Sequence, residues 1–320
     1  MDIKRTSGKR VSASQRDSFT AQSNKTTIRR PWKSLATVVF GLLLSVPGLT
    51  QAQYNFTTID VPGATATAAN GNSTNQIVGE YDDADGTHGF VWNNGVFTTK
   101  LNFPDAISTS LNGINASGQL VGTYFGAGGV SMRRAFFGNN GYFTTLLPPV
   151  AGVIRSQGGF INAQGQAVGS YRDATKAYGF IWRNGTFTTL LIDVQKDDLA
   201  TVPFGINDIG MVVGDYVDKN GDTHGFLRSR DGAFKPIDVP DAVITVAEGI
   251  NNAGKIVGVY VDANDLRHGF VSNNGVVFTT IDVHDAKETQ INSINAKGEI
   301  VGFYIDSTDV EHGFLGVPIR

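Results

Sequence analysis

The 320-residue chain contains no cysteine, so disulfide bonds, thiolate metal sites and cysteine nucleophiles are all excluded. Charged residues make up only 17% of the sequence, and Met and Trp occur three times each. No Gly-x-Ser-x-Gly elbow, His-Glu-x-x-His pair or Walker spacing is present, so three common catalytic and nucleotide-binding signatures are missing. Glycine (39 residues) and phenylalanine (20 residues) are abundant instead, which favours short strands joined by tight turns.

Charge is divided unevenly along the chain. Residues 1–52 carry nine Lys or Arg and two Asp or Glu, whereas the remainder carries 17 basic and 27 acidic residues, a net charge of −10. Because phosphate binding requires a basic surface, this acidic body argues against a nucleic-acid partner.

The first 52 residues have the pattern of an export signal. A polar, basic stretch (1–33) precedes an apolar run (35–49) and the small residues Thr50 and Ala52. We predict a bacterial signal peptide over 1–52, and a secreted protein that is extracellular or periplasmic. Pro47 and the short apolar run argue against a stable membrane span, and Arg29-Arg30 partly resembles a twin-arginine motif, so Sec and twin-arginine export both remain open.

One sequence unit recurs through the rest of the chain. Five copies follow the pattern Asn-x-x-Gly-x-(apolar)-Val-Gly-x-Tyr, and a first copy, "NSTNQIVGEY", has Asn75 in place of the turn glycine. The second glycine of the six copies recurs every 43–47 residues, at Gly79, Gly122, Gly169, Gly214, Gly258 and Gly302. We expect the repeated asparagines to open a turn by capping it with their side chains: Asn72, Asn115, Asn162, Asn207, Asn251 and Asn295.

Each unit contains four segments with strand character, separated by turn signals. Asn-Gly or Asp-Gly pairs at 94–95, 140–141, 184–185, 231–232 and 274–275 predict tight hairpins. A period near 44 residues with four strands is typical of a propeller blade, so residues 53–320 are predicted to form an all-β, six-bladed β-propeller of four-stranded blades. The last unit lacks its fourth strand and residues 54–60 form a lone fourth strand, so the N-terminal strand should complete the last blade and close the ring. An open β-solenoid is the alternative.

The chain resembles the bacterial extracellular HAF-repeat proteins over residues 54–320. Their His-Ala-Phe signature is here mostly His-Gly-Phe, at 88–90, 224–226, 268–270 and 312–314. The third copy has Tyr178-Gly179-Phe180, and the second has Arg134-Ala135-Phe136, which keeps the alanine and lacks the histidine. The resemblance implies a secreted β-repeat fold and brings no activity or catalytic residues.

Residues repeated in every unit are expected to be structural, because a catalytic base is needed only once. This applies to His88, His224, His268 and His312. The repeated tyrosines, among them Tyr81, Tyr216, Tyr260 and Tyr304, and the repeated phenylalanines are expected to pack between blades. A carbohydrate-stacking platform would require the tyrosine rings to face solvent.

The acidic residues are expected to share one face. The loops between the second and third strands, and between successive units, hold 21 of the 27 acids after residue 52. Ligand or partner binding is predicted for ten residues of these loops: Asp82, Asp85, Asp218, Asp222, Asp262, Asp265, Asp306, Asp309, Arg133 and Arg134. No cofactor is required, but two Asp-rich runs loosely resemble calcium loops and could hold Ca²⁺: Asp82, Asp83 and Asp85, and Asp218, Asn220 and Asp222.

Three functional hypotheses follow. The leading one is a secreted, non-catalytic propeller that binds a protein or carbohydrate partner at the cell surface through its acidic loop face. The rival is a lactonase- or lyase-like enzyme with one divalent metal at the mouth of the central channel, held by carboxylates among Asp105, Asp197, Asp241, Asp285 and Glu248. The third is a structural surface-layer or matrix component.

Overall fold

The computed structural model describes residues 54–126, 133–191 and 200–319, and the signal peptide predicted over 1–52 lies outside them. The described residues form 24 strands, and none of them belongs to a helix long and apolar enough to span a membrane. Each sequence unit, which we call a repeat, supplies four antiparallel strands, here named A to D in the order of their pairing.

The strands of the six repeats have the following bounds. Strand A is β2 (Ala66–Asn72), β6 (Ala106–Ile114), β10 (Arg155–Ile161), β14 (Ala200–Ile206), β18 (Ile244–Ile250) and β22 (Glu288–Ile294). Strand B is β3 (Gln76–Asp83), β7 (Leu120–Gly126), β11 (Ala167–Arg172), β15 (Val212–Val217), β19 (Lys255–Val261) and β23 (Ile300–Ile305). Strand C is β4 (Gly86–Asn93), β8 (Arg133–Asn139), β12 (Ala177–Arg183), β16 (Thr223–Arg228), β20 (Arg267–Asn273) and β24 (Glu311–Pro318). Strand D is β5 (Val96–Thr98), β9 (Tyr142–Leu146), β13 (Thr186–Leu190), β17 (Phe234–Ile237), β21 (Val277–Ile281) and β1 (Tyr54–Thr58).

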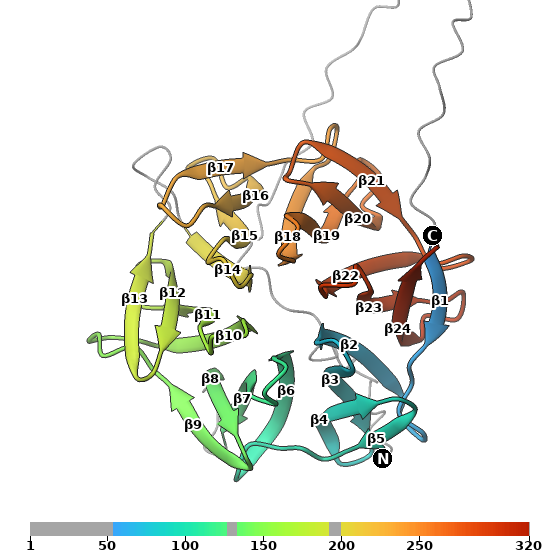
Figure 1. The fold of residues 1–320 in the computed structure, drawn as a ribbon, viewed down its shortest axis with the longest axis horizontal. Helices are drawn as coiled ribbons and strands as arrows, with labels where there is room; N and C mark the ends of the chain where they lie inside the picture. Colours follow the sequence, from blue (N-terminus) through green and yellow to red (C-terminus); the bar gives the residue numbers. More distant parts are fainter. Residues whose placement is uncertain (1–53, 127–132, 192–199, 320) are drawn as a thin grey trace, which may run out of the picture.

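The sheets stand around a central axis with the A strands innermost, which is a β-propeller (Figure 1). The prediction of six separate blades is wrong: the structure has four separate four-stranded blades and one eight-stranded sheet. The larger sheet joins β10–β13 to β14–β17 through a single parallel pair, Ala177 with Ala200. This pair forms because strand A of the fourth repeat begins beside the start of β12, a contact that the repeat pattern does not encode.

The two ends of the described chain meet in one sheet, as predicted. β1 pairs antiparallel with β24, from Thr58 opposite Phe314 to Tyr54 opposite Pro318. The Phe56 ring contacts the Phe314 ring edge-on, with centroids 5.4 Å apart. This pairing covers the edge of β24, so the N-terminal strand completes the sheet of the last repeat (Figure 1).

One phenylalanine and one glycine per repeat form the centre of each sheet. The six phenylalanines of strand C are completely buried: Phe90, Phe136, Phe180, Phe226, Phe270 and Phe314. A Cβ atom on Gly258 would lie 2.9 Å from the Phe270 ring and would also collide with the Val246 carbonyl oxygen. The Val-Gly-x-Tyr motif therefore has its glycine because an aromatic ring and a neighbouring backbone leave no room for a side chain.

The predicted hairpin turns between strands C and D form with one exception. Both residues have positive φ in the Asn-Gly pairs at 94–95, 140–141, 184–185 and 274–275. In the Asp231-Gly232 pair only Gly232 has positive φ, because Asp231 instead uses its carboxylate to accept the Ala233 N–H. The first repeat also differs from prediction, since Ser73 and not Asn72 opens its A–B turn.

Candidate functional site

Bulges in the inner strands direct polar side chains toward the axis. In all six repeats the A–B pairing shifts near the same position, for example between Leu111 and Gly113. In five of them the shift leaves one residue of strand A unpaired with strand B, and that residue is buried: Asn70, Asn112, Phe204, Glu248 and Asn292. A bulge turns one side chain toward the axis without ending the strand, so the inner strands can fill the centre of the ring with side chains.

The bulge residues of four repeats form a hydrogen-bonded belt around the axis. Gln290 donates to Asn292 (2.9 Å) and lies 3.5 Å from Glu248. Asn292 donates to the Ala69 carbonyl, Asn70 to the Leu111 carbonyl, and Asn112 to the Gly158 carbonyl, at 3.0, 3.2 and 2.6 Å. Across the axis, the fourth and fifth repeats contribute an apolar cluster of Val202, Phe204, Val246 and Val259. The centre of the ring is therefore polar toward the first three repeats, whereas the fourth and fifth repeats add both apolar side chains and the buried carboxyl groups of Asp215 and Glu248.

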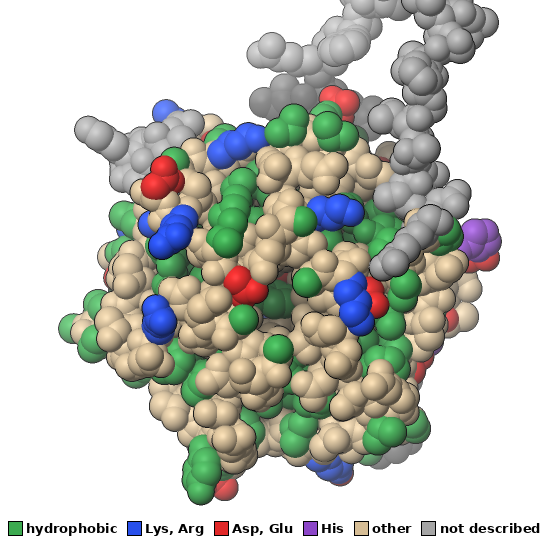
Figure 2. Space-filling view, in the orientation of Figure 1, with side chains coloured by type: hydrophobic (Ala, Val, Ile, Leu, Met, Phe, Trp, Pro, Cys, Tyr) green, Lys and Arg blue, Asp and Glu red, His purple; other side chains and the backbone are tan. Residues whose placement is uncertain are grey.

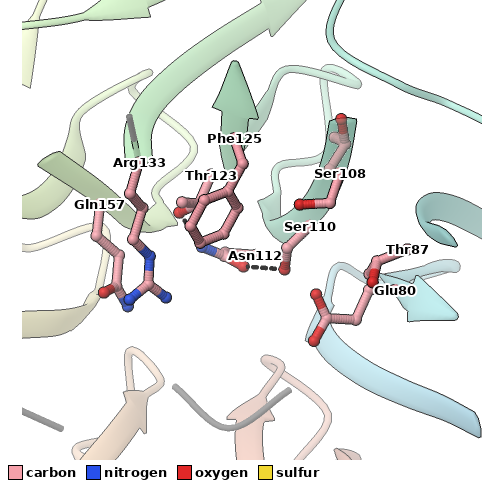
Figure 3. Close-up of a pocket in the computed structure, with 10 residues that line it drawn as sticks. Glu80, Thr87, Ser108, Ser110, Asn112, Thr123, Phe125, Arg133 and Gln157 are labelled. Carbon is pink, nitrogen blue, oxygen red and sulfur yellow. Dashed lines mark hydrogen bonds between the residues drawn. The ribbon is translucent and has the colours of Figure 1, made fainter. Parts of the chain in front are cut away.

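The polar side opens into a cleft between the first three repeats, which we call the axial cleft (Figure 3). Its walls are Glu80, Thr87, Ser108, Thr109, Ser110, Asn112, Thr123, Phe125, Arg133 and Gln157. Ser110 donates to the Asn112 side chain at 2.9 Å, and Asn112 donates to the Thr123 hydroxyl at 3.2 Å. The Arg133 guanidinium lies over the Phe125 ring, 5.8 Å from its centroid. The Gln157 side chain is 4% exposed, and its Oε1 atom has no hydrogen-bond partner.

The axial cleft is narrow. The space that the centre of a water molecule can occupy in the cleft is about 20 Å³. All the empty space of the cleft, including its side open to solvent, is about 330 Å³. The inner end has room for one or two waters, and a larger ligand would enter by one edge. The available groups are a carboxylate, a guanidinium, hydroxyls, amides and one aromatic face.

The symmetry of the repeats breaks beside this cleft. At the start of strand C, His is replaced by Arg134 in the second repeat and by Tyr178 in the third. In the other repeats an Asp or Asn after strand D faces this position. The second and third repeats have the exposed Leu147 and Leu191 there instead. Four arginines lie at the ends of strands around these two repeats: Arg133, Arg134, Arg155 and Arg172. The loop face therefore carries basic side chains here, beside the acidic loops of the other repeats.

In the four repeats that keep it, the histidine clamps two loops together. His268 Nδ1 lies 2.8 Å from Asp282 of the D–A loop, and Nε2 lies 3.8 Å from Asp262 of the B–C loop. His312 lies between Asp60 and Asp306 in the same way, at 2.7 and 3.4 Å. His224 lies between Asp238 and Asp218, and His88 lies between Asn102 and Asp83.

The repeated tyrosines stack on these histidines. Tyr216, Tyr260 and Tyr304 each lie parallel to the histidine opposite in strand C, with centroids 5.1–5.2 Å apart, and Tyr81 lies 5.5 Å from His88. These four tyrosines are buried or half-buried, so they do not form a solvent-facing platform for sugars. Each of them also packs in an apolar cluster shared with the preceding repeat around the ring, as Tyr260 does with Val213 and Leu227, so these rings lie between blades as the sequence predicts.

The aspartates that open the B–C loops stabilise their own turns. Asp262 accepts the backbone N–H groups of Asn264 and Leu266, and Asp306 accepts those of Thr308 and Val310. The N–H group of Val310 is the main factor that lowers the pKa of Asp306 to about 2. Asp218 accepts from Asn220 and Asp222 in the same geometry. Asp265 and Asp309 have φ of 63° and 67°, a conformation that Asp tolerates in turns.

Two of the predicted acidic ligands form no such turn. Asp82 accepts a hydrogen bond from the Thr87 hydroxyl at 2.6 Å. Asp222 is exposed at the other end of the loop that Asp218 opens, and its carbonyl accepts the Asp218 N–H. Neither residue lines the axial cleft, and of the ten predicted ligand-binding residues only Arg133 does.

Asp83, Asp85 and His88 form one group with metal-ligand geometry among the described residues. Lys100 lies 2.7 Å from Asp85 and 3.7 Å from Asp83, so an ammonium group already offsets one of the two negative charges. Hydrogen bonding by the Asp85 N–H is the main cause that lowers the pKa of Asp83. The second predicted calcium run, Asp218, Asn220 and Asp222, bonds mainly within its own turn.

The carboxylates of the predicted enzyme site do not converge in the described part of the chain. Asp105, Asp241 and Asp285 have positive φ in three different D–A loops, and Asp197 lies outside the described residues. Glu248 is buried at the axis and interacts with Asp215, which is 1% exposed. Burial, followed by the negative charge of Glu248, raises the pKa of Asp215 to about 8.

The opposite end of the axis is closed by an asparagine ladder. The side-chain amide of each A–B turn asparagine donates to a backbone carbonyl of the next repeat at 3.0–3.2 Å: Asn115 to Asn162, Asn162 to Asn207, Asn207 to Asn251, Asn251 to Asn295, and Asn295 to Ser73. These turns line a shallow hollow of about 150 Å³, visible at the centre of the ring in Figure 2. The prediction that these asparagines cap turns is confirmed, and each also links neighbouring repeats.

Sequence reasoning missed Glu80, Thr123, Phe125 and Gln157 because it concentrated on positions that repeat. Between the glycine and tyrosine of the Val-Gly-x-Tyr motif the six repeats have Glu80, Thr123, Ser170, Asp215, Val259 and Phe303. Variation at one position of an otherwise regular motif is the signal that could have identified the axial cleft.

The comparisons with known proteins show the fold alone. No protein-family model matches the chain, and no curated protein matches it. A protein of unknown function from Dyadobacter fermentans shares 9% identity with a TM-score of 0.58 over 86% of this chain and all of that chain. A gluconolactonase from Xanthomonas campestris shares 12% identity (TM-score 0.50, 83% and 90% coverage), and an Aleuria aurantia lectin in complex with Fucα1-6GlcNAc shares 9% (TM-score 0.50, 82% and 98%). The chain is similar in fold to these β-propellers.

Proposed function

We propose that this protein is a binding β-propeller that takes a polyhydroxylated ligand, such as the edge of a saccharide, in the axial cleft. The observation that carries the proposal is the convergence of Glu80, Arg133, Gln157 and several hydroxyls from three repeats around the Phe125 ring. The cleft lies where the repeats lose their His clamp, so its composition is not required by the scaffold.

The chemistry of the cleft suits sugar hydroxyls. A carboxylate and an amide oxygen accept hydrogen bonds, a guanidinium donates them, and an aromatic face packs against the C–H side of a pyranose. The partner-free Oε1 atom of Gln157 is buried, and such an acceptor is most favourable when a ligand hydroxyl or water satisfies it. Lectins among proteins of similar fold support the class of ligand, while the residues of this chain carry the argument.

We favour binding over metal-dependent hydrolysis because the described carboxylates lie in separate loops or bond within their own turns. The sequence-based expectations that complete the proposal are export by residues 1–52, action outside the cytoplasm and membership of the HAF-repeat family. Calcium bound at the Asp83 or Asp218 loops would be an addition to this function.

The test is a glycan array probed with the purified chain, followed by calorimetric titration of the best saccharide. Phe125→Ala should weaken binding at least ten-fold, because it removes the aromatic face and the surface that holds Arg133. Tyr142→Ala, at a ring that is 81% exposed on β9, is the matched aromatic control and should bind like the unmodified chain. Loss of binding in both variants, or no saccharide bound by the unmodified chain at millimolar concentration, would refute the proposal.

A further inference from the structure

A second cavity lies away from the axial cleft, between the third and fourth repeats. It measures about 410 Å³ and is lined by the ends of strands A and C and the turns that follow them, which contribute Gln166, Arg183, Asp208, Ile209, Arg228 and Arg230. We call it the arginine groove. It shares Ile206 and Asp208 with the hollow above the asparagine ladder, so it opens at the opposite end of the axis from the axial cleft.

The groove concentrates positive charge on an acidic protein. Three arginines line it, although residues 53–320 have a net charge of −10. The structure shows no ion pair between Arg183 or Arg230 and any described carboxylate, and Arg228 is compensated only by its proximity to Asp231. Lys and Arg side chains are also spread over the face shown in Figure 2, around the central hollow.

The one carboxylate in the groove is already engaged. Asp208 accepts the Ala163 N–H at 2.8 Å and the Asn252 side-chain amide at 2.7 Å, so it ties the fourth repeat to both neighbours. Gln166 accepts from Asn162 through Oε1, which leaves its NH₂ group as a donor. Apart from the side-chain carbonyl of the exposed Gln164, the polar side-chain groups open to a ligand are therefore donors, and three of them are cationic.

Apolar side chains accompany the arginines. Ile181 and Ile206 are half-buried or buried, and Ile209 is 52% exposed. An aliphatic surface beside three guanidinium groups suits an organic anion better than a hydrated inorganic ion, because the ligand buries carbon while its oxyanions meet the arginines.

We propose that the arginine groove is a binding site for a small organic polyanion that carries two or more carboxylate or phosphate groups. The volume suits a ligand of disaccharide to trisaccharide size, within the range of ordinary ligand pockets. Two guanidinium groups without a described carboxylate partner gain charge-assisted, bidentate hydrogen bonds from such a ligand. The site is independent of the axial cleft and of the function proposed for it.

Calorimetric titration of the full chain tests the site with three probes at low ionic strength. The probes are trigalacturonate for carboxylates, inositol hexakisphosphate for phosphates, and maltotriose as the neutral control of trisaccharide size. We expect one anionic probe to bind and maltotriose not to bind. Affinity should fall as salt is raised, because the charges on the rim of the groove are exposed. Which anion binds distinguishes the two sources of negative charge.

Three variants localise the binding. Arg183→Gln and Arg230→Gln should each weaken the anionic probe about ten-fold, since each removes one charge-assisted contact. Arg267→Gln makes the same change of charge at the start of β20, outside the groove, and should leave affinity unchanged. Phe125→Ala should also bind the anion normally, which separates this site from the axial cleft. Equal weakening by Arg267→Gln, or no binding of either anion, would overturn the proposal.

Discussion

At the scale of the residue, the repeated motif is explained by contacts that leave little freedom. Each Val-Gly-x-Tyr glycine lies against the carbonyl of strand A, and five of the six also lie under a buried phenylalanine ring of strand C. A methyl group in this space would have to move a strand and not a flexible side chain. The glycine was predicted from its recurrence, but its reason required the position of the ring.

We predict that Gly258→Ala lowers the free energy of unfolding by about 3 kcal/mol or more, because overpacking displaces backbone and the Phe270 ring together. Thermal and urea unfolding of the purified variant measures the change. Gly63→Ala is the control, since Gly63 has φ of 82° but nothing within 4 Å of the added methyl. It should cost only about 1 kcal/mol of backbone strain. Similar losses for both glycines would contradict the packing explanation.

The histidines show how far single residues could be interpreted from sequence. Their repetition predicted a structural role, and the clamp between two loops agrees with it. The partners could not be assigned because Asp282 lies fourteen residues from His268 and Asp60 lies 252 residues from His312. In the second and third repeats Arg134 and Tyr178 stand in place of the histidine, and Leu147 and Leu191 stand in place of its Asp partner. These replacements are visible in the sequence, and they mark the two repeats that lack the clamp.

At the scale of the element, bulges decide what the inner strands present to the axis. Repeat length, strand order and turn positions could be predicted, because glycine, asparagine and alternating apolar residues specify them locally. The axial cleft could not be predicted from the repeat pattern, since its residues become neighbours only when strands of three repeats meet. The parallel bridge between the third and fourth repeats is likewise a contact between elements with no local signal.

The buried Asp215 of β15, next to Glu248 of β18, makes the stability of the fold depend on pH. Because the pKa of Asp215 rises from its ordinary 3.8 to about 8 in the folded chain, the folded state holds a proton that the unfolded state releases near pH 4. This contribution is complete below pH 4 and is lost as pH rises toward 8. We therefore predict that the melting temperature falls between pH 5 and 9, and that Asp215→Asn removes most of the fall.

Asp173→Asn is the control for that experiment. Hydrogen bonds from Thr175 and Lys176 lower the pKa of Asp173 to about 2, so its contribution is lost only as pH falls below 4. With this substitution the melting temperature should fall between pH 5 and 9 as steeply as it does in the unmodified chain. An unchanged slope in Asp215→Asn would mean that Asp215 is ionised in the folded protein.

At the scale of the whole molecule, one short strand closes the ring. β1 is the fourth strand of the last sheet, and its Phe56 packs on Phe314. Without it, β24 would present an unpaired edge, which can recruit another chain. The ring therefore couples the start of the described chain to its end, and contacts continue around the axis through the belt and the asparagine ladder.

Removing this strand should destabilise the molecule more than its length suggests. We compare a chain that starts at Tyr54 with one that starts at Ile59, which keeps the hydrogen bond from Ile59 to Gly313. The shorter chain should lose at least about 2 kcal/mol, the value of one buried phenylalanine, and should self-associate through the exposed edge. Thermal unfolding and light scattering measure both effects. A peptide of residues 54–60 added in trans should restore the melting temperature and suppress association, because it offers β24 the same hydrogen bonds and the Phe56 ring. If the two chains melt alike and stay monomeric, the ring is held by contacts between neighbouring sheets, and strand closure is not what stabilises it.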